Sequence, residues 1–527
     1  MKRLLFLFLF TLPLPLLGDD LPQEIPRPAS DAYRHPAQLP FVQRPAEING
    51  NYRKITVSPK MLPDPLLRYR VNTFASEQET GNAYPLFVAA LKEYIKHADG
   101  ARIAHYRSEA YRSLDSDKEE DQRTMGYLLF KAFPLYSHWS RDMWTEITAE
   151  DEARLYQRLD GVYRLMEKAS KKTYFDWSDE YKFAGIATTL EPLQEARELS
   201  RYLSGKANRE IRNGNYVDAI RTIRVGLAHA EHILESRPPG FLVGMLVGLA
   251  LKQMMFDQLF LLSAQPDAPN LYLALMQLTV SQKHWLDAIR SEALLWVIPQ
   301  YNDERFWDTL DSLSPEQAQS ILDEFALLFQ SVESTSEEPE KNRLPLTRTA
   351  ICVASYQPAK QRLLQKGLSE EAIEAFSTYQ IVVPFILEEI KRTYDLLSVE
   401  ASMPVANTPA AFNFDEHVMS LTRNPHSSAD NLLALITPAT RAARTAFTRQ
   451  TQTLDLLKIV EAIRYFSALH GKLPASLDEI TELAVPKMCP ITATPYRYSV
   501  SGNTAVIDYS MYDRDHRDKS RLEIVLE

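Results

Sequence analysis

Cysteine and glycine are scarce in this chain, whose 527 residues include two cysteines and 16 glycines against 32 prolines. Two cysteines exclude a small scaffold held together by many disulfides. The sequence contains no glycine-rich phosphate loop, no paired-histidine metal motif and no Gly-x-Ser-x-Gly elbow. These gaps exclude the enzyme classes that such motifs define. The excess of proline over glycine favours helices joined by proline-marked breaks.

Basic charge is also in short supply. The chain has 59 lysines and arginines against 69 acidic residues, so its formal net charge at pH 7 is −10. Without a basic domain the sequence predicts no nucleic-acid partner. A hydrophobic content of 45% is enough for a large core divided among several units.

The N-terminus has the pattern of a secretory signal peptide over residues 1–18. Lys2 and Arg3 form the positive region, an apolar run follows, and Gly18 is the small residue at the end. We therefore expect an extracytoplasmic protein, periplasmic or secreted. The alternative is that this segment stays uncleaved and anchors the chain.

A second apolar run begins at residue 241, and Lys252 interrupts it before it reaches the roughly 20 residues of a membrane span. Gly244 and Gly248 stand four residues apart, which lets another helix pack against the backbone. The pattern predicts a helix buried within the protein, and no membrane span beyond the signal peptide.

Between the signal peptide and the core, residues 19–65 carry nine prolines and little periodicity, which predicts an extended arm. A helical core is expected over residues 66–330. Its aromatic cluster at residues 127–144 suits either core packing or a ligand platform, and its helical spacing favours packing. Within the cluster, His138 and Asp142 have the His-x-x-x-Asp spacing of some acyltransferases, but an i,i+4 pair also arises by chance.

Residues 195–264 form the centre of this core. Apolar residues at helical spacing on both sides of Gly214 predict a helical hairpin, because Gly214 can adopt the left-handed conformation that ends a helix. With the small Ala219 one turn after Tyr216, the hairpin resembles one tetratricopeptide (TPR) repeat. That resemblance implies a groove for partners and a solenoid-like arrangement; a plain bundled core is the alternative.

Proline and polar residues mark the next boundaries. Ser314 and Gln317 flank Pro315 as a capping box, which predicts the start of a helix. The acidic stretch 331–342 predicts an exposed loop and a hinge between helical units. A second helical block is expected over residues 347–450.

The two cysteines, Cys352 and Cys489, allow two interpretations. In an oxidising compartment they would be able to pair and tie the C-terminal module to the rest of the chain. They fit equally well as two separate buried thiols.

The last segment, residues 454–527, predicts a small α+β module. A helix ends at His470 and Gly471, and a short second helix is expected with Ser476 and Glu479 as a capping box. Alternation and turn residues then predict a three-stranded antiparallel sheet with strands at 496–500, 504–509 and 521–526. The predicted fold is therefore mainly α, with helical hairpins in a solenoid-like or bundled core and this module at the end.

The module resembles the C-terminal part of type II secretion pseudopilins and of uncharacterised exported bacterial helical proteins with the same tail. The resemblance rests on His470, Gly471, Pro474 and Leu477, followed by Pro490 and the Tyr-Arg-Tyr run at 496–498. It covers about residues 454–518 and extends weakly to residue 195. It implies a link to an envelope or secretion assembly.

In the pseudopilins that this module resembles, a loop after the last shared strand binds calcium. The matching residues here are Asp513, Asp515 and Asp518, which offer hard oxygen ligands. Neighbouring basic residues can neutralise these acids, the glycines of the family loop are absent, and Cys489 stands where the family has aspartate. The sequence therefore favours a turn held by ion pairs over a calcium site, and no other cofactor is expected.

These features predict a non-enzymatic exported interaction or scaffold protein of the cell envelope, with a protein partner in the envelope or secretion machinery. Three alternatives stay open. One is a small-molecule-binding protein with an aromatic-lined cavity, another is a hydrolase or transferase with a site among the helices, and the last is a structural envelope component that uses the proline-rich arm.

Overall fold

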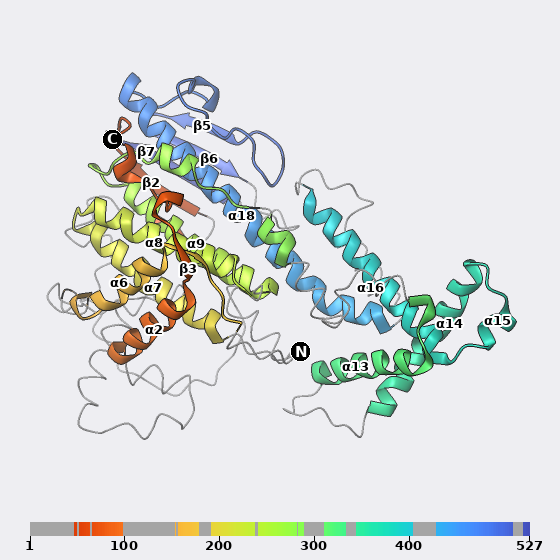
Figure 1. The fold of residues 1–527 in the computed structure, drawn as a ribbon. Helices are drawn as coiled ribbons and strands as arrows, with labels where there is room; N and C mark the ends of the chain where they lie inside the picture. The colour runs from red at the N-terminus through yellow and green to blue at the C-terminus, as the bar shows by residue number, and fades with distance from the viewer. Residues whose placement is uncertain are drawn as a thin grey trace, which may run out of the picture.

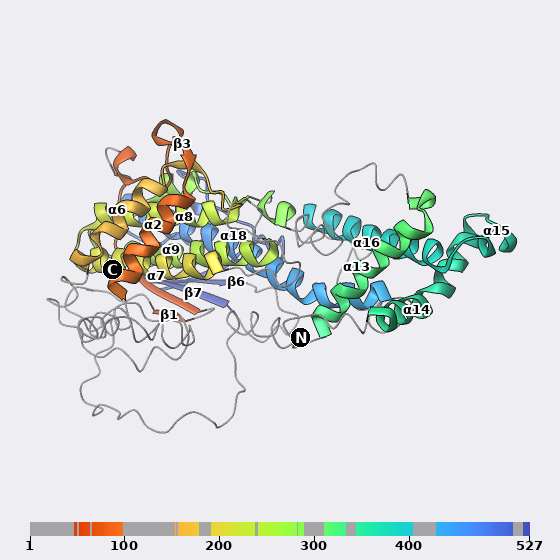
Figure 2. The same cartoon turned by 60° about the horizontal axis from the view of Figure 1, so that its bottom comes forward.

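Figure 1 shows the chain as a computed structural model, which describes residues 47–49, 52–63, 66–98, 153, 156–178, 191–237, 241–281, 283–288, 310–333, 344–403, 428–509 and 520–527. The described part is mostly helical with a small sheet, as the sequence predicts. A larger lobe contains the sheet and the helices of the first half of the chain, and a smaller lobe projects from it (Figure 2). The predicted signal peptide and the arm up to residue 46 lie outside the described residues.

The predicted hairpin forms the middle of the larger lobe. Its two helices pack against each other, and Gly214 between them has a φ of 73°, as expected for a glycine that ends a helix. Helices α2 and α6 pack together on its outer side, where short strands β3 and β4 pair in parallel. The bounds are α2 (Tyr84–Ala98), α6 (Asp160–Ala169), α7 (Glu191–Arg212), α8 (Tyr216–Leu234), β3 (Glu79–Asn82), β4 (Lys172–Tyr174), η3 (Leu66–Tyr69) and η4 (Ala75–Glu77).

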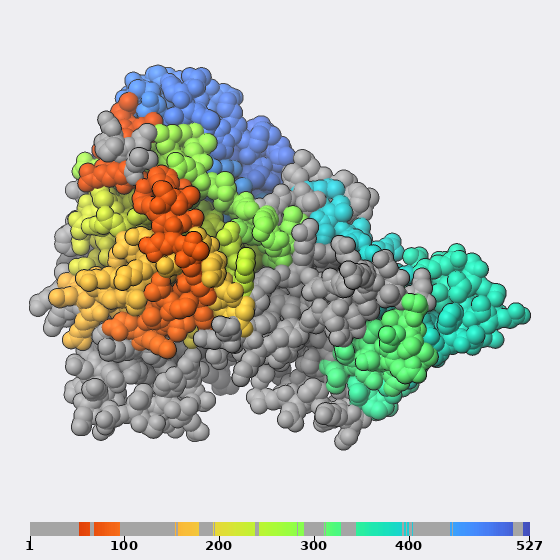
Figure 3. Space-filling model, viewed as in Figure 1, coloured from red at the N-terminus to blue at the C-terminus, as the bar shows by residue number. Residues whose placement is uncertain are grey.

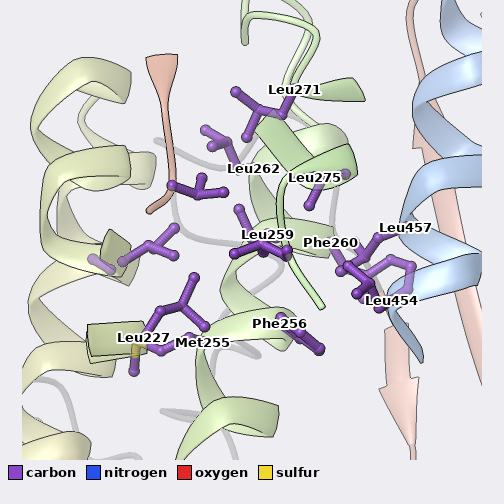
Figure 4. Close-up of a cluster of buried hydrophobic side chains, with 14 of the residues drawn as sticks. Leu227, Met255, Phe256, Leu259, Phe260, Leu262, Leu271, Leu275, Leu454 and Leu457 are labelled. Atoms are coloured by element: carbon purple, nitrogen blue, oxygen red, sulfur yellow. The ribbon is translucent and has the colours of Figure 1, made fainter. Parts of the chain in front are cut away.

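The apolar run forms α9 (Phe241–Ser263), which lies at the centre of the larger lobe. Figure 4 shows Phe256, Leu259 and Phe260 of α9 between Leu227 of α8 and Leu454 of the long C-terminal helix. Among the described helices, only this one is long and apolar enough to cross a membrane, and 72% of its apolar window is buried inside the protein. The burial agrees with the prediction of a core helix.

The sheet has five strands in the order β1-β2-β7-β6-β5, whereas the sequence predicts three. The three predicted strands are present and antiparallel, and β2 adds to them by pairing in parallel with β7 along its whole length. Strands β1 and β2 therefore belong to the sheet and not to an extended arm, because alternating apolar residues of β2, such as Ile55 and Val57, find a buried face there. The bounds are β1 (Glu47–Asn49), β2 (Tyr52–Val57), β5 (Arg497–Ser501), β6 (Thr504–Tyr509) and β7 (Ser520–Leu526).

One helix, α18 (Ser428–His470), extends from the smaller lobe to the sheet (Figure 1). It ends where the sequence predicts, with Gly471 at a φ of 67°. It also runs through the expected boundary between residues 450 and 454, so no break separates the second helical block from the C-terminal module. The polar side chains of Gln450 and Gln452 in that stretch are buried, so the helix packs against the rest of the chain there.

The predicted capping box at Ser476 is wrong. Only the short 3-10 turn η12 (Leu477–Glu479) forms after it, and the Ser476 side chain makes no capping hydrogen bond. The Glu479 carboxylate instead accepts a hydrogen bond from the backbone N–H of Ala475.

The smaller lobe has its own hydrophobic core, to which α13, α14 and α16 contribute. The capping box at Ser314 forms as predicted: Gln317 N donates to Ser314 Oγ at 3.2 Å, and Ser314 N donates to Gln317 Oε1 at 2.8 Å. Because α13 shares a core with α14, the acidic stretch 331–342 connects two helices of one unit and is not a hinge between units. The bounds are η8 (Leu310–Ser312), α13 (Pro315–Glu333), α14 (Leu344–Gln365), α15 (Glu370–Glu374) and α16 (Thr378–Ser402), with α10 (Tyr272–Met276) in the larger lobe.

Candidate interaction surface

Several predicted site residues lie outside the described residues. They are the three aspartates of the calcium hypothesis, Asp513, Asp515 and Asp518, together with His138 and Asp142 and the surrounding aromatic cluster. These hypotheses stay predictions. Within the described ranges, no group of three His, Cys, Asp or Glu side chains is arranged to hold a metal ion.

The two cysteines are both free and buried. Cys352 belongs to the core of the smaller lobe, and Cys489 belongs to the core of the larger lobe, where Gln452 Nε2 donates to its Sγ at 3.3 Å. Each thiol packs inside a different hydrophobic core, and the structure contains no disulfide between them. The alternative interpretation, two separate buried thiols, is the one that the structure shows.

The hairpin that resembles a TPR repeat has both sides covered. Helix α9 packs on α7 and α8 from one side, while α2 and α6 pack from the other. Helices α8 and α9 approach each other closely at Gly226, because a Cβ at this position would lie 2.2 Å from Met255 Sδ of α9. The groove expected from the resemblance is thus filled by other helices of the same chain.

A partly buried polar cluster lies where α8, α9 and the helical residues 283–288 meet. The Lys252 ammonium is 1% exposed; it pairs with Glu231 and donates to the Thr279 carbonyl at 3.1 Å. The other Glu231 oxygen lies 3.3 Å from His284 Nε2. Although burial raises the pKa of Glu231, these two partners outweigh burial and hold that pKa below its usual value. Both oxygens of Glu231 have partners inside the protein, which assigns the cluster a structural role at this junction.

A second buried network fixes α18 to the larger lobe. Arg464 is fully buried, and its guanidinium donates to Glu461 at 2.9 Å and to the backbone carbonyls of Ala268 (2.8 Å), Ser58 (3.3 Å) and Pro269 (3.4 Å). Glu461 also accepts a hydrogen bond from Ser263 Oγ of α9 at 2.6 Å. The sequence pattern places an apolar face on this helix and gives no sign that the charged residues between the apolar positions are buried as well.

The strongest candidate for a functional surface is the outer face of α14 in the smaller lobe. The inner face of this helix, with Ile351 and Ala359, is buried in the lobe. On the opposite side, Leu346 is 73% exposed and Val353 is 75% exposed. Single exposed apolar residues are common, but a row of them on one helix face marks an interaction site.

These residues form a continuous stripe along the helix. Leu346, Ala350, Val353 and Gln357 are all exposed and follow one another at intervals of four, three and four residues, which places them on one side of an α-helix. The chain from residue 349 to 359 carries no charged side chain. We call these four residues the α14 stripe.

The sequence alone does not reveal the α14 stripe, because its residues resemble core residues. Leu346 and Val353 have the spacing that normally indicates burial, and only the packing of α13 and α16 on the other face shows which side is free. Figure 3 shows that the smaller lobe projects from the body of the molecule.

Comparisons of this chain with protein-family models, with curated proteins and with solved structures give no match.

Proposed function

We propose that this protein is a non-enzymatic, exported interaction protein of the cell envelope, and that it binds a helix of a partner protein on the α14 stripe. The exposure of Leu346 and Val353 on one uncharged helix face carries the proposal. Export is supported by the signal-peptide pattern of residues 1–18, and the link to an envelope or secretion assembly by the resemblance of the C-terminal module to pseudopilins.

The chemistry of the stripe selects the kind of partner. Ala350 lies between the larger Leu346 and Val353, and a small residue between two branched ones lets a second helix approach closely. A charged side chain on the partner would lose hydration there without gaining an opposite charge, because residues 349–359 are uncharged. The partner surface is therefore an apolar helix face.

The position of α14 suits this role. The lobe is folded around a core of its own, so a partner can bind there without disturbing the larger lobe. The C-terminal module, by contrast, is packed into the larger lobe through β2, α9 and α18. This packing supports docking of the tail on the core of its own chain, and it leaves the α14 stripe as the surface offered to a partner.

The test uses a substitution that breaks the stripe without damaging the fold. Val353→Glu places a charge on the exposed face, and Gln365→Glu adds the same charge at an exposed position near the end of the same helix. Since both side chains are exposed, neither variant is expected to change the unfolding temperature measurably. A photo-crosslinking residue at position 357, an exposed position of the same stripe, should capture a defined partner from the envelope of the source cell.

The expected result is that Val353→Glu and Leu346→Glu abolish capture while Gln365→Glu leaves it unchanged. Equal capture by the two classes of variant would refute the α14 stripe as the binding surface. A crosslink to a second copy of this chain, with a matching dimer mass by light scattering, would show that the α14 stripe mediates self-association instead of binding a different protein.

A further inference from the structure

The exposed face of α14 continues beyond the α14 stripe. Gln361 and Leu364 follow Gln357 at intervals of four and three residues, and both are exposed. Leu364 comes 18 residues after Leu346, which is about five turns of an α-helix, so the two leucines lie on the same side of α14 near its opposite ends. We call the α14 stripe together with Gln361 and Leu364 the full α14 face, and it is about 27 Å long.

The charged residues of α14 are all engaged within the smaller lobe. Each of the three has an acidic partner on another helix: Arg348 pairs with Asp323 of α13 (2.9 Å), Lys360 with Glu370 of α15 (3.7 Å) and Arg362 with Glu388 of α16 (3.7 Å). A surface helix normally turns its charged side chains toward water. On α14 the charges make contacts inside the lobe, and the full α14 face, which is exposed, carries none.

The middle of the full α14 face is polar although it is uncharged. Gln357 and Gln361 each carry an amide that donates and accepts hydrogen bonds. Pro358 lies between them inside the helix, and proline has no backbone N–H. The carbonyl of Ala354, four residues earlier, therefore lacks its usual helical donor, and Ala354 is exposed. Hydrogen-bonding groups occupy the middle of the face, while a leucine stands at each end.

We infer that the partner presents a single α-helix of about five turns, which lies along the full α14 face. Its side chains are apolar where they meet Leu346, Val353 and Leu364. In its middle it carries uncharged hydrogen-bonding side chains, such as serine, threonine, asparagine or glutamine, which meet the two glutamines and the Ala354 carbonyl. This inference rests on the proposed function and names the length and chemistry of the partner.

Two simpler partners fit this face less well. A charged side chain would lose hydration without gaining an opposite charge, because the charges of α14 already have partners. A wholly apolar helix would cover the amides of Gln357 and Gln361 and leave them without hydrogen bonds, which costs binding free energy. A polar position within an apolar contact also fixes the register of two paired helices.

The first measurement determines the length of the partner helix. A photo-crosslinking residue replaces either Thr349 or Gln365 in the full chain; both positions are exposed, and they border the full α14 face at opposite ends without belonging to it. In the envelope fraction of the source cell, both should capture the same protein. Mass spectrometry should place the two crosslinks about 16 residues apart on one helix, because paired helices rise equally per residue. Capture from Thr349 alone, or crosslinks to separate segments, would overturn the five-turn helix.

The second measurement compares neighbouring residues, with the crosslinking residue kept at position 349. Leu364→Glu and Gln365→Glu add the same charge one residue apart, but only Leu364 belongs to the face. Leu364→Glu should reduce capture about tenfold, the loss expected for an apolar contact, and Gln365→Glu should leave it unchanged. The unfolding temperature of each variant is measured first. If Leu364→Glu lowers it, Leu364→Gln provides the same comparison without a charge.

The third measurement tests the chemistry of the middle of the face. Gln361→Leu makes α14 more apolar, yet it should weaken capture severalfold, because a polar group of the partner loses its hydrogen bond. Stronger capture by Gln361→Leu would overturn the polar contact and indicate a wholly apolar partner helix.

These results separate the inference from the proposed function. Loss of capture in Val353→Glu but not in Leu364→Glu would overturn the five-turn partner and leave the α14 stripe as a shorter binding surface. Unchanged capture in both variants would refute the α14 stripe itself.

Discussion

Arg53 Nη1 donates a hydrogen bond to the hydroxyl of Tyr509 at 3.1 Å, although 456 residues separate them in the chain. Arg53 lies on β2 and Tyr509 on β6, and Asp257 of α9 approaches the same guanidinium at 3.6 Å. Burial of the Tyr509 hydroxyl raises its pKa, which keeps it neutral. The contact joins both ends of the chain to the central helix of the larger lobe.

This joining predicts that β2 is essential to the larger lobe. Ile55 is fully buried on β2, so Ile55→Ala should lower the free energy of unfolding by about 2 to 4 kcal/mol, measured by urea denaturation. Lys54→Ala, at the neighbouring exposed position, should change it by less than about 0.5 kcal/mol. Similar small effects of both substitutions would show that β2 contributes little to the core.

The buried pair on α18 predicts a strong asymmetry between single and double variants. Arg464→Met leaves the Glu461 carboxylate buried without its partner and should cost about 3 to 5 kcal/mol. Adding Glu461→Met removes that uncompensated charge, and part of the stability should return. A double-mutant cycle in denaturant measures the coupling. A double variant less stable than Arg464→Met would contradict this explanation.

Two glycines of α9 should respond in opposite directions to the same change. A Cβ at Gly248 would lie 2.6 Å from Leu234 Cγ and 3.3 Å from the Ala230 carbonyl oxygen, so Gly248→Ala should destabilise the protein by about 1 to 3 kcal/mol. At Gly244 the nearest atom, Leu193 Cδ1, is 3.7 Å away, which is an ordinary contact. Gly244→Ala should therefore stabilise the helix by up to about 1 kcal/mol. Thermal unfolding of the two variants compares them directly.

Asp455 on α18 predicts a pH dependence of stability. Burial raises its pKa to about 6, although Lys458 and Tyr496 act in the opposite direction. The folded state then holds the proton more tightly than the unfolded state, whose carboxyl has an ordinary pKa near 4. The stabilising contribution of this carboxyl to the free energy of unfolding is fully present below about pH 4 and is lost as the pH rises through 6.

Asp455→Asn removes this titration. The unfolding temperature of the variant should exceed that of the wild type at pH 8. At pH 4, measured in the same way, the two temperatures should differ little. An equal difference at both pH values would mean that the carboxyl does not titrate as its burial indicates.

Local patterns predicted the parts of the fold that depend on nearby residues. The strand at 504–509 and the end of the last long helix at His470 have the predicted bounds, since alternation and a terminal glycine act over a few residues. Strand β2 was missed because prolines surround it and its partner, β7, is at the other end of the chain. No local signal reports a pairing over such a distance.

The candidate surface was harder to predict than the fold. Ile351 and Val353 are both β-branched and only two residues apart, yet one is 3% exposed and the other 75%. Their difference depends on which helices pack beside α14, and a single sequence does not contain that information.

The parallel pairing of β2 with β7 has a consequence for the order in which the protein is made. Synthesis proceeds from the N-terminus, so β2 is made long before β7. Until then, β2 lacks its parallel partner. A chain that stops before Ser520 would lack β7 and would leave β2 without its parallel partner, so the early strand depends on residues made much later.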